Sequence, residues 1–181
     1  DATQPHCIAG VFGGKDSGID EETTTVFLES AYFHPVSIRK TAKFHGLNTD
    51  ASFRFERGID PEIGIMALER AAILIKQLAG GEVSSEIQEF TKPLGEAVQI
   101  FLSFEKIEKT IGQPLEKEEL NNILNGLDIS IVNVSESGIG MTIPRYRVDV
   151  TRPADVIEEI LRVYGYNRLI ETPLVFEANP S

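Results

Sequence analysis

The sequence contains a single cysteine, Cys7, so no disulfide bond can form within the chain. A lone thiol fits a reducing compartment, and we expect a cytoplasmic protein rather than a disulfide-stabilised secreted one. No apolar run approaches the roughly 18 residues needed to span a membrane. The opening DATQPHCIAG lacks the regions of a signal peptide and has no initiator methionine. We therefore expect no membrane association, and we interpret the chain as a piece of a longer protein.

Basic residues are scarce. Seventeen Lys and Arg stand against 28 Asp and Glu, which gives a formal net charge of −11 at pH 7. Proteins that bind nucleic acid without sequence preference are normally basic, because their affinity comes from neutralising phosphates. The charge argues against a general DNA or RNA binder but leaves open one part of a larger RNA-binding assembly. With 181 residues, 41% of them hydrophobic, the chain can form one large domain or two small ones.

Two apolar runs near the start of the chain predict strands. The run CIAGVF at residues 7–12 is followed by Gly13 and Gly14, which is typical of a strand entering a turn. Residues 15–25 are polar and turn-rich, and we expect a loop there. The next run, VFLESAYF at 26–33, is rich in β-branched and aromatic residues and predicts a second, largely buried strand.

Two helices are expected in the next part of the chain. The first spans residues 35–46, with a proline in its first turn and a glycine at its end. The second spans residues 60–81, where Asp-Pro begins a stretch with apolar residues at helical spacing and Gly-Gly ends it. Between them, residues 47–58 begin with residues that are typical of turns. We place a domain boundary near Pro93.

The sequence pattern after the boundary predicts a series of short strands and helices. Ser103 is a suitable helix cap, and Gly138 marks the turn of a hairpin. The expected elements are a strand at 98–102, helices at 104–112 and 116–127, hairpin strands at 128–134 and 140–144, and a helix at 155–165. The predicted fold class for the whole chain is α+β, with helices and short strands segregated.

The segment VDVTRPADVIEEI places Asp149, Asp155, Glu158 and Glu159 within eleven residues. One interpretation is structural: Asp155 and Glu158 have capping-box spacing, and Glu158 precedes Arg162 by four residues, a supportive ion-pair spacing. The other is a cation site, because three of the carboxylates share one helix face and the fourth precedes the turn. Magnesium prefers such hard oxygen ligands, completed by water. The residues alone favour the structural interpretation.

Four motifs, in this order and spacing, resemble the beta subunit of bacterial phenylalanyl-tRNA synthetase. They are IAGVFGGKDSG at 8–18, FLESAYF at 27–33, NTDASFRFERGIDP at 48–61 and RVYGYN at 162–167. The resemblance runs from about residue 8 to 172. It implies that residues 1–92 are the C-terminal half of an α/β tRNA-editing domain. It also implies that residues 93–172 are a small winged-helix-like assembly domain and that residues 173–181 are a linker.

The resemblance also implies an activity. The family charges its tRNA with phenylalanine, using ATP and magnesium at an alpha subunit, in an assembly of two alpha and two beta chains. The beta subunit hydrolyses mischarged tyrosyl-tRNA. An apolar pocket rejects an added hydroxyl by only about a hundredfold, so a second site must read that hydroxyl by hydrogen bonding. The chain is expected to act as part of such a ligase with editing activity, and to be inactive alone.

The resemblance assigns Gly13, Glu29, Thr49 and Ala51 to the editing pocket. Glycine lets a ligand approach the backbone, a carboxylate accepts a hydrogen bond from a phenol, threonine can bond the amino acid, and alanine leaves room for a ring. Structural interpretations stay open: a turn residue at 13 or 49, or an ion pair of Glu29 with Arg54. No catalytic side chain is predicted, since the family's chemistry depends on a positioned water and on the tRNA.

The resemblance makes the four clustered carboxylates, Asp149, Asp155, Glu158 and Glu159, magnesium ligands in a site shared with the alpha subunit. The locally basic stretch at 39–57 is a candidate contact for the tRNA acceptor end, or a solvated helix face. The alternative function is a winged-helix-like nucleic-acid-binding or scaffold module at 93–171. That region has eight Lys and Arg against thirteen Asp and Glu, a net charge of −5, which disfavours a DNA surface.

Overall fold

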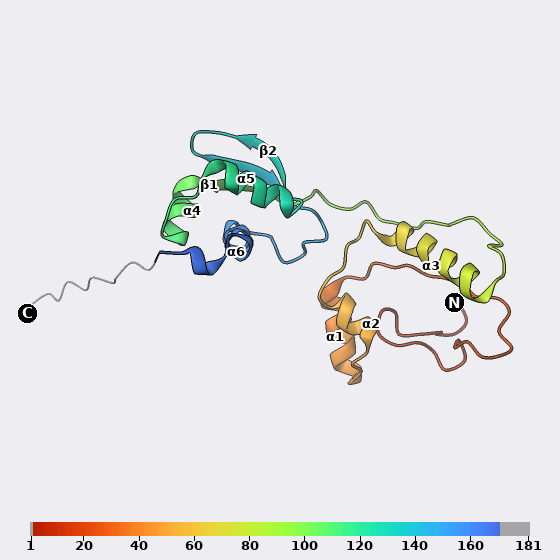
Figure 1. Ribbon diagram of the computed structural model, residues 1–181. Coiled ribbons are helices and arrows are strands. Elements are labelled where there is room, and N and C mark those ends of the chain that lie inside the picture. Colours follow the sequence, from red (N-terminus) through yellow and green to blue (C-terminus); the bar gives the residue numbers. More distant parts are fainter. Residues whose placement is uncertain (1, 171–181) are drawn as a thin grey trace, which may run out of the picture. The chain divides into compact units, whose positions relative to one another are not determined.

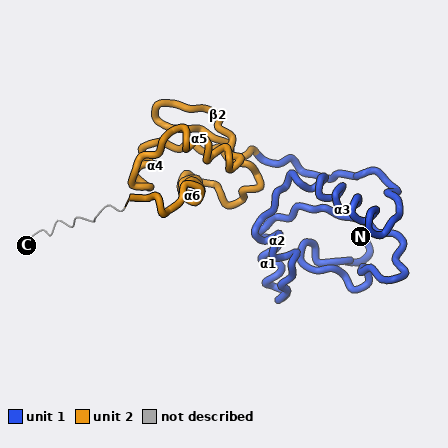
Figure 2. The backbone as a smooth tube through the Cα atoms, viewed as in Figure 1, with its two compact units in different colours: residues 1–95 blue, residues 96–181 orange. Residues whose placement is uncertain are grey.

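The computed structural model describes residues 2–170 (Figure 1). The chain divides into two compact units, residues 1–95 and residues 96–181 (Figure 2). The linker expected at 173–181 lies outside the described residues. No helix in residues 2–170 has the length and apolar character needed to cross a membrane. The mixture of helices with one small antiparallel sheet confirms the predicted α+β class.

The first unit contains three helices: α1 at Pro35–His45, α2 at Asp50–Phe55 and α3 at Gly64–Ala79. The structure confirms α1, which has its proline in the first turn and ends at Gly46 in the left-handed conformation with φ of 64°. The helix expected from residue 60 begins later, because Asp60 instead accepts a hydrogen bond from the Glu62 amide at 2.9 Å and closes a turn.

The strands predicted at the start of the chain are wrong. Residues 7–12 form a tight turn closed by an isolated bridge between Ile8 and Phe12, and residues 26–33 form no strand. The run at 26–33 is also largely exposed, with Phe27 at 93%. A strand is stable only where another chain segment pairs with its backbone, and within residues 2–95 no strand lies beside this run.

The first unit has a small apolar core between the opening turn and α1. Val11, Ile38 and Ala42 are buried there. Ile8, Phe33, Leu47 and Phe55 pack against these three. The rings of Phe33 and Phe55 meet edge to face, with centroids 4.9 Å apart, a favourable aromatic geometry. This core holds the turn at 8–12 next to helix α2, and both segments line one pocket.

The second unit confirms the predicted order of elements. They are β1 at Gln99–Ser103, α4 at Phe104–Ile111, α5 at Lys117–Gly126, β2 at Ser130–Val134, β3 at Gly138–Thr142, α6 at Pro153–Tyr164 and a 3-10 turn at Tyr166–Arg168. The strands form one antiparallel sheet in the order β1-β3-β2. As predicted, Ser103 caps α4 by accepting a hydrogen bond from the Lys106 amide at 3.2 Å.

The core of the second unit lies between the sheet and its helices. Helix α6 packs against both α4 and α5, and all three helices pack against the sheet (Figure 1). On the sheet, Ile100 pairs with Met141 and Leu102 with Ile139, and all four side chains are buried. Phe101 alternates to the opposite face and is half-exposed. Val156 and Ile157 of α6 belong to this core, which therefore holds the N-terminal part of the helix in place.

Candidate functional site

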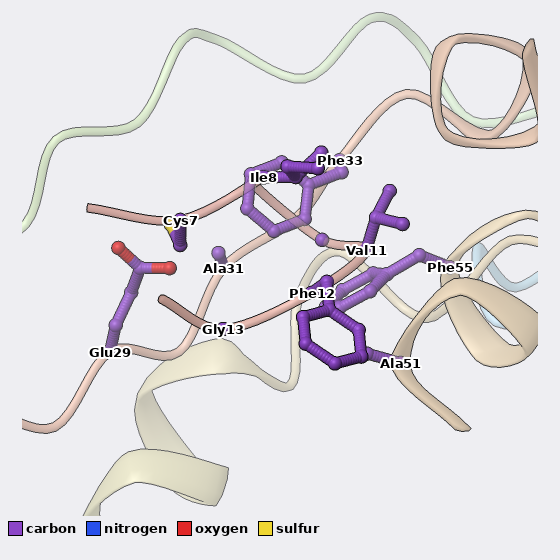
Figure 3. A pocket seen from close by; sticks show the side chains of 11 residues that line it. Cys7, Ile8, Val11, Phe12, Gly13, Glu29, Ala31, Phe33, Ala51 and Phe55 are labelled. Carbon is purple, nitrogen blue, oxygen red and sulfur yellow. The ribbon is translucent and has the colours of Figure 1, made fainter. Parts of the chain in front are cut away.

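An open pocket of about 270 Å³ lies in the first unit, against the turn at 8–12 and helix α2 (Figure 3). Three of the four residues predicted for the editing pocket line it: Gly13, Glu29 and Ala51. Its other lining residues are Cys7, Ile8, Gly10, Val11, Phe12, Ala31, Phe33 and Phe55. The lining is therefore apolar and aromatic, with one carboxylate, and segments far apart in sequence contribute to it.

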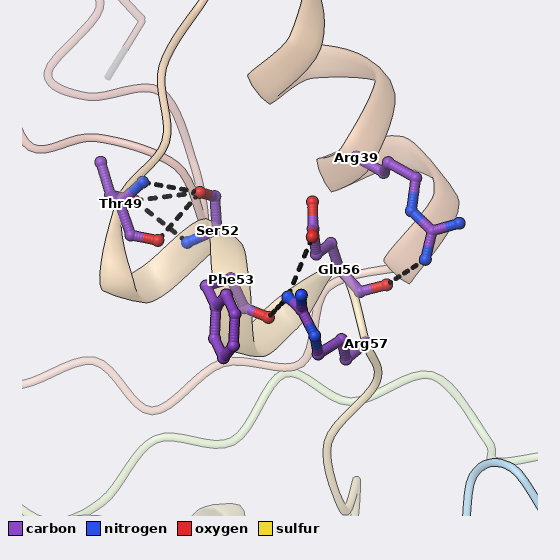
Figure 4. Close-up of polar contacts among 6 residues, drawn as sticks. All are labelled: Arg39, Thr49, Ser52, Phe53, Glu56 and Arg57. Carbon is purple, nitrogen blue, oxygen red and sulfur yellow. Dashed lines mark hydrogen bonds and ion pairs between the residues drawn. The ribbon is translucent and has the colours of Figure 1, made fainter.

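Thr49, the fourth predicted residue, does not line the pocket. Its hydroxyl donates a hydrogen bond to the Val11 carbonyl and accepts one from the Ser52 amide at 3.1 Å. The Ser52 hydroxyl in turn accepts a hydrogen bond from the Thr49 amide at 3.0 Å, which completes a capping box at the start of α2 (Figure 4). Thr49 therefore joins two walls of the pocket.

Gly10, which the sequence analysis did not single out, is the glycine that this site requires. Its φ of +69° lies in the left-handed region, and a Cβ there would come within 2.6 Å of Ile38 and 2.7 Å of Phe33. Gly13 lines the pocket, but a Cβ at that position would meet nothing within 4 Å. Gly10 therefore shapes the turn, whereas Gly13 leaves one edge of the pocket open.

Glu29 is the only carboxylate on the pocket lining, and it lies at the opposite end from Ala51 and Phe55 (Figure 3). Its side chain is exposed and makes no hydrogen bond or ion pair within residues 2–170, so the alternative pairing with Arg54 is not formed. A carboxylate without a partner retains its full capacity to accept hydrogen bonds. The pocket can therefore receive an aromatic ring between apolar walls and a donor group at Glu29.

The basic stretch at 39–57 is partly engaged in local contacts. Arg39 donates to the Glu56 carbonyl at 3.2 Å (Figure 4). Arg57 donates to the Phe53 carbonyl at 2.7 Å, pairs with the Glu56 carboxylate at 3.0 Å, and lies 3.5 Å from the centre of the Phe53 ring. These contacts hold α1 and α2 together and place an arginine on an exposed aromatic side chain.

The predicted capping box at Asp155 and Glu158 is wrong, because α6 begins two residues earlier, at Pro153. Asp155 occupies the third helical position and accepts hydrogen bonds from the backbone amides of Thr151 and Arg152 at 3.1 and 2.9 Å. Its other oxygen accepts from the Arg152 guanidinium at 2.8 Å. The bond from Arg152, followed by the amide bonds, lowers the pKa of Asp155 to about 2.

Glu159 is held by two arginines. Arg147 donates to it at 2.8 Å, and Arg162 donates to its two oxygens at 3.2 and 2.6 Å. The pair of Arg162 with Glu158 predicted from the sequence is therefore wrong, since Arg162 bonds the carboxylate three residues before it. Arg162, with a smaller contribution from Arg147, lowers the pKa of Glu159.

The four predicted magnesium ligands are not gathered into a site. Asp149 and Glu158 are exposed, whereas Asp155 and Glu159 are bonded to arginines. Within residues 2–170 no group of three or more His, Cys, Asp or Glu side chains is placed to hold a metal ion. The donor chemistry suits a hard cation, but the arrangement in this structure does not fit one.

Comparisons with known proteins find two domain families in this chain. A B3/4 domain matches residues 1–80, and a tRNA synthetase B5 domain matches residues 100–166. The chain is similar to phenylalanine–tRNA ligase beta subunits. It is 51% identical to that of Bacteroides fragilis over 173 residues, 52% to that of Porphyromonas gingivalis over 165, and 41% to that of Legionella pneumophila over 175.

These matches cover most of this chain and a small part of each relative. They include 96%, 91% and 96% of the chain but only 21%, 20% and 22% of the three relatives. The chain therefore spans about a fifth of the length of the curated relatives it matches. The two domain families fall on the two compact units, the first on residues 1–95 and the second on residues 96–181.

Proposed function

Because the chain belongs to the family of phenylalanine–tRNA ligase beta subunits, we propose that its first unit forms part of a site that hydrolyses mischarged tyrosyl-tRNA. The observation that carries the proposal is the apolar pocket with Glu29 as its single carboxylate. The aromatic ring of the misattached amino acid lies among the apolar side chains. Its hydroxyl donates a hydrogen bond to Glu29.

The chemistry of this pocket supports discrimination between tyrosine and phenylalanine. A phenol offers Glu29 a donor, whereas a phenyl ring leaves the carboxylate without a partner and displaces water from it. Ala51 and Gly13 leave space at the pocket edge, and the open mouth gives water access to the ester. Water positioned by the tRNA carries out the hydrolysis, so the pocket needs no nucleophile of its own.

The exposed cations of α1 and α2 support a tRNA contact beside the pocket. Lys40, Lys43 and Arg54 are exposed and make no ion pair within residues 2–170, and Phe44 is 84% exposed. Cations neutralise phosphates, and an exposed ring can stack on an unpaired base of the acceptor end. The acidic remainder of the chain limits this contact to one small surface.

For the whole protein we propose the activity of its named relatives, ATP-dependent charging of tRNA with phenylalanine. The partners are tRNA and an alpha subunit that holds the charging site, in an assembly of two alpha and two beta chains. The second unit contributes to assembly with that subunit and to a shared magnesium site at Asp149, Asp155, Glu158 and Glu159. Since the chain spans about a fifth of its relatives, we expect it to catalyse neither charging nor hydrolysis alone.

The proposal can be tested by grafting. Residues 8–170 replace the matching segment of the Bacteroides fragilis beta subunit, which is co-expressed with its alpha subunit. We expect the purified assembly to charge tRNA with phenylalanine and to hydrolyse tyrosyl-tRNA much faster than phenylalanyl-tRNA. An assembly that charges tRNA normally but hydrolyses both esters at the uncatalysed rate would contradict the editing role.

A further inference from the structure

The turn at residues 8–12 has two arms, and both arms reach the pocket of the first unit. The amide of the first residue of the turn donates a hydrogen bond to the carbonyl of the last at 2.8 Å, which closes the turn. Cys7 continues one arm and Gly13 the other, and both residues line the pocket. They lie towards the end of the pocket that holds Glu29 (Figure 3). The separation of the two arms therefore sets the width of the pocket beside this carboxylate.

Gly14 lets the two arms approach each other, because it has no side chain. A Cβ at position 14 would collide with the backbone carbonyl of His6, whose carbon atom would be only 2.9 Å away. A backbone group cannot turn aside as the end of a side chain can, so a methyl group at position 14 would force the arms apart. Gly13 and Gly18 differ in this respect, since a Cβ at either position would meet nothing within 4 Å.

Closely spaced arms favour the recognition of a phenol at Glu29. A hydroxyl group that fits closely displaces water, so its hydrogen bond to the carboxylate does not compete with hydrogen bonds from water. If the arms separate, water stays beside the carboxylate and can satisfy it whether the ring carries a hydroxyl or not. The tyrosyl ester then loses its advantage, whereas the phenylalanyl ester, which offers the carboxylate no donor, loses little.

We propose that Gly14 is a positioning residue for specificity, because its contact with the His6 backbone holds the arms at the separation at which Glu29 distinguishes tyrosine from phenylalanine. The inference rests on the proposed editing function. It gives Gly14, which does not line the pocket, a role that the neighbouring lining residue Gly13 does not have. Ser17 supports the same arm, since its hydroxyl donates a hydrogen bond to the Gly14 carbonyl at 3.2 Å.

The first test is hydrolysis by the grafted assembly, with the graft extended to begin at residue 2 so that it includes His6. Gly14→Ala should lower the preference for tyrosyl-tRNA over phenylalanyl-tRNA about tenfold, through slower hydrolysis of tyrosyl-tRNA alone. Charging with phenylalanine should not change. The matched control is Gly18→Ala in the same loop, which should keep the preference. An unchanged preference in Gly14→Ala, or an equal loss for both esters as expected from lower stability alone, would contradict the positioning role.

The second test measures the separation of the arms without hydrolysis. Cys7 is the only cysteine of the 181-residue chain and adjoins His6, so its rate of alkylation by iodoacetamide reports on that arm. We expect alkylation about threefold faster in Gly14→Ala than in the parent chain, and no change in Gly18→Ala. Equal rates in all three proteins would overturn the inference.

Unfolding curves must show that each variant is folded. If Gly14→Ala is not, Ser17→Ala provides the test, because it removes the bond to the Gly14 carbonyl without a collision. It should lower the preference for tyrosyl-tRNA about twofold, and an unchanged preference would contradict the inference. A parent assembly that hydrolyses neither ester, together with faster alkylation in Gly14→Ala, would contradict the editing function and support the spacing role of Gly14. The two proposals can therefore fail independently.

Discussion

Among single residues, Thr49 has the most informative position, since its hydroxyl connects Val11 on the pocket lining to the start of α2. Replacing it with valine keeps the shape but removes the α2 cap and the bond to the Val11 carbonyl. We expect a loss of about 1–2 kcal/mol in the stability of the first unit, measured by urea unfolding. Thr49→Ser keeps the hydroxyl and should lose much less. Equal losses in the two variants would mean that the hydroxyl contributes nothing.

Asp155 makes the stability of the second unit depend on pH. Its pKa is 3.8 ordinarily and about 2 in the folded chain, because Arg152 and two backbone amides bond the charged form. The stability that ionised Asp155 gives the second unit is therefore present above pH 3.8 and is lost as the pH falls towards 2. Asp155→Asn should flatten that part of the profile of urea midpoint against pH. Glu158→Gln, at an exposed position on the same helix, should leave the profile as it is.

At the scale of elements, the second unit could be predicted well from its sequence. Its signals are local: Ser103 caps a helix, Gly112 ends it, and apolar residues recur at helical or alternating spacing. The predicted start of α6 at residue 155 is two residues too late, because Pro153 occupies the first turn of the helix.

The first unit could be predicted only in part, since a strand depends on a partner that local sequence does not reveal. The run at 26–33 has strand composition but no backbone neighbour among the described residues. Three of the four predicted pocket residues meet, yet the sequence analysis missed that Thr49 and Ser52 have the spacing of a cap for α2. The contact of Arg147 with Glu159 was missed because the two residues are 12 positions apart in sequence, whereas Arg162 was predicted to pair with Glu158 instead.

Amide hydrogen exchange should distinguish the paired strand β3 from the unpaired run at 26–33. Residues of β3 at Gly138–Thr142 bond to strands on both sides and should exchange at least about a hundredfold more slowly than residues 26–33. Residues 26–33 have no backbone hydrogen bonds within the described part of the chain and should exchange almost freely. Protection of 26–33 equal to that of β3 would show that this run is a paired strand after all.

At the scale of the whole molecule, the exposed apolar side chains of the first unit predict self-association. Phe27 and Phe90 are each 93% exposed and Leu78 is 86% exposed. Apolar surface of this kind associates with a second copy when no other partner covers it. Light scattering should show a mass that rises with concentration, and Phe27→Ser with Phe90→Ser should reduce the rise. The control is Phe101→Ser, at a half-exposed position of the second unit. A monomer mass that stays constant as the concentration rises would contradict the prediction of self-association.

The central claim is that Glu29 reads the tyrosine hydroxyl, and the ratio of two hydrolysis rates in the grafted assembly tests it most directly. A hydrogen bond to a charged group contributes roughly 1.5–3 kcal/mol, so Glu29→Ala should reduce the preference for tyrosyl-tRNA over phenylalanyl-tRNA about 10- to 200-fold. Charging with phenylalanine should be unchanged. Glu69→Ala, which removes an exposed carboxylate on α3, should keep the full preference. If Glu29→Ala also keeps the full preference, with or without a lower melting temperature, Glu29 is not the group that recognises the hydroxyl.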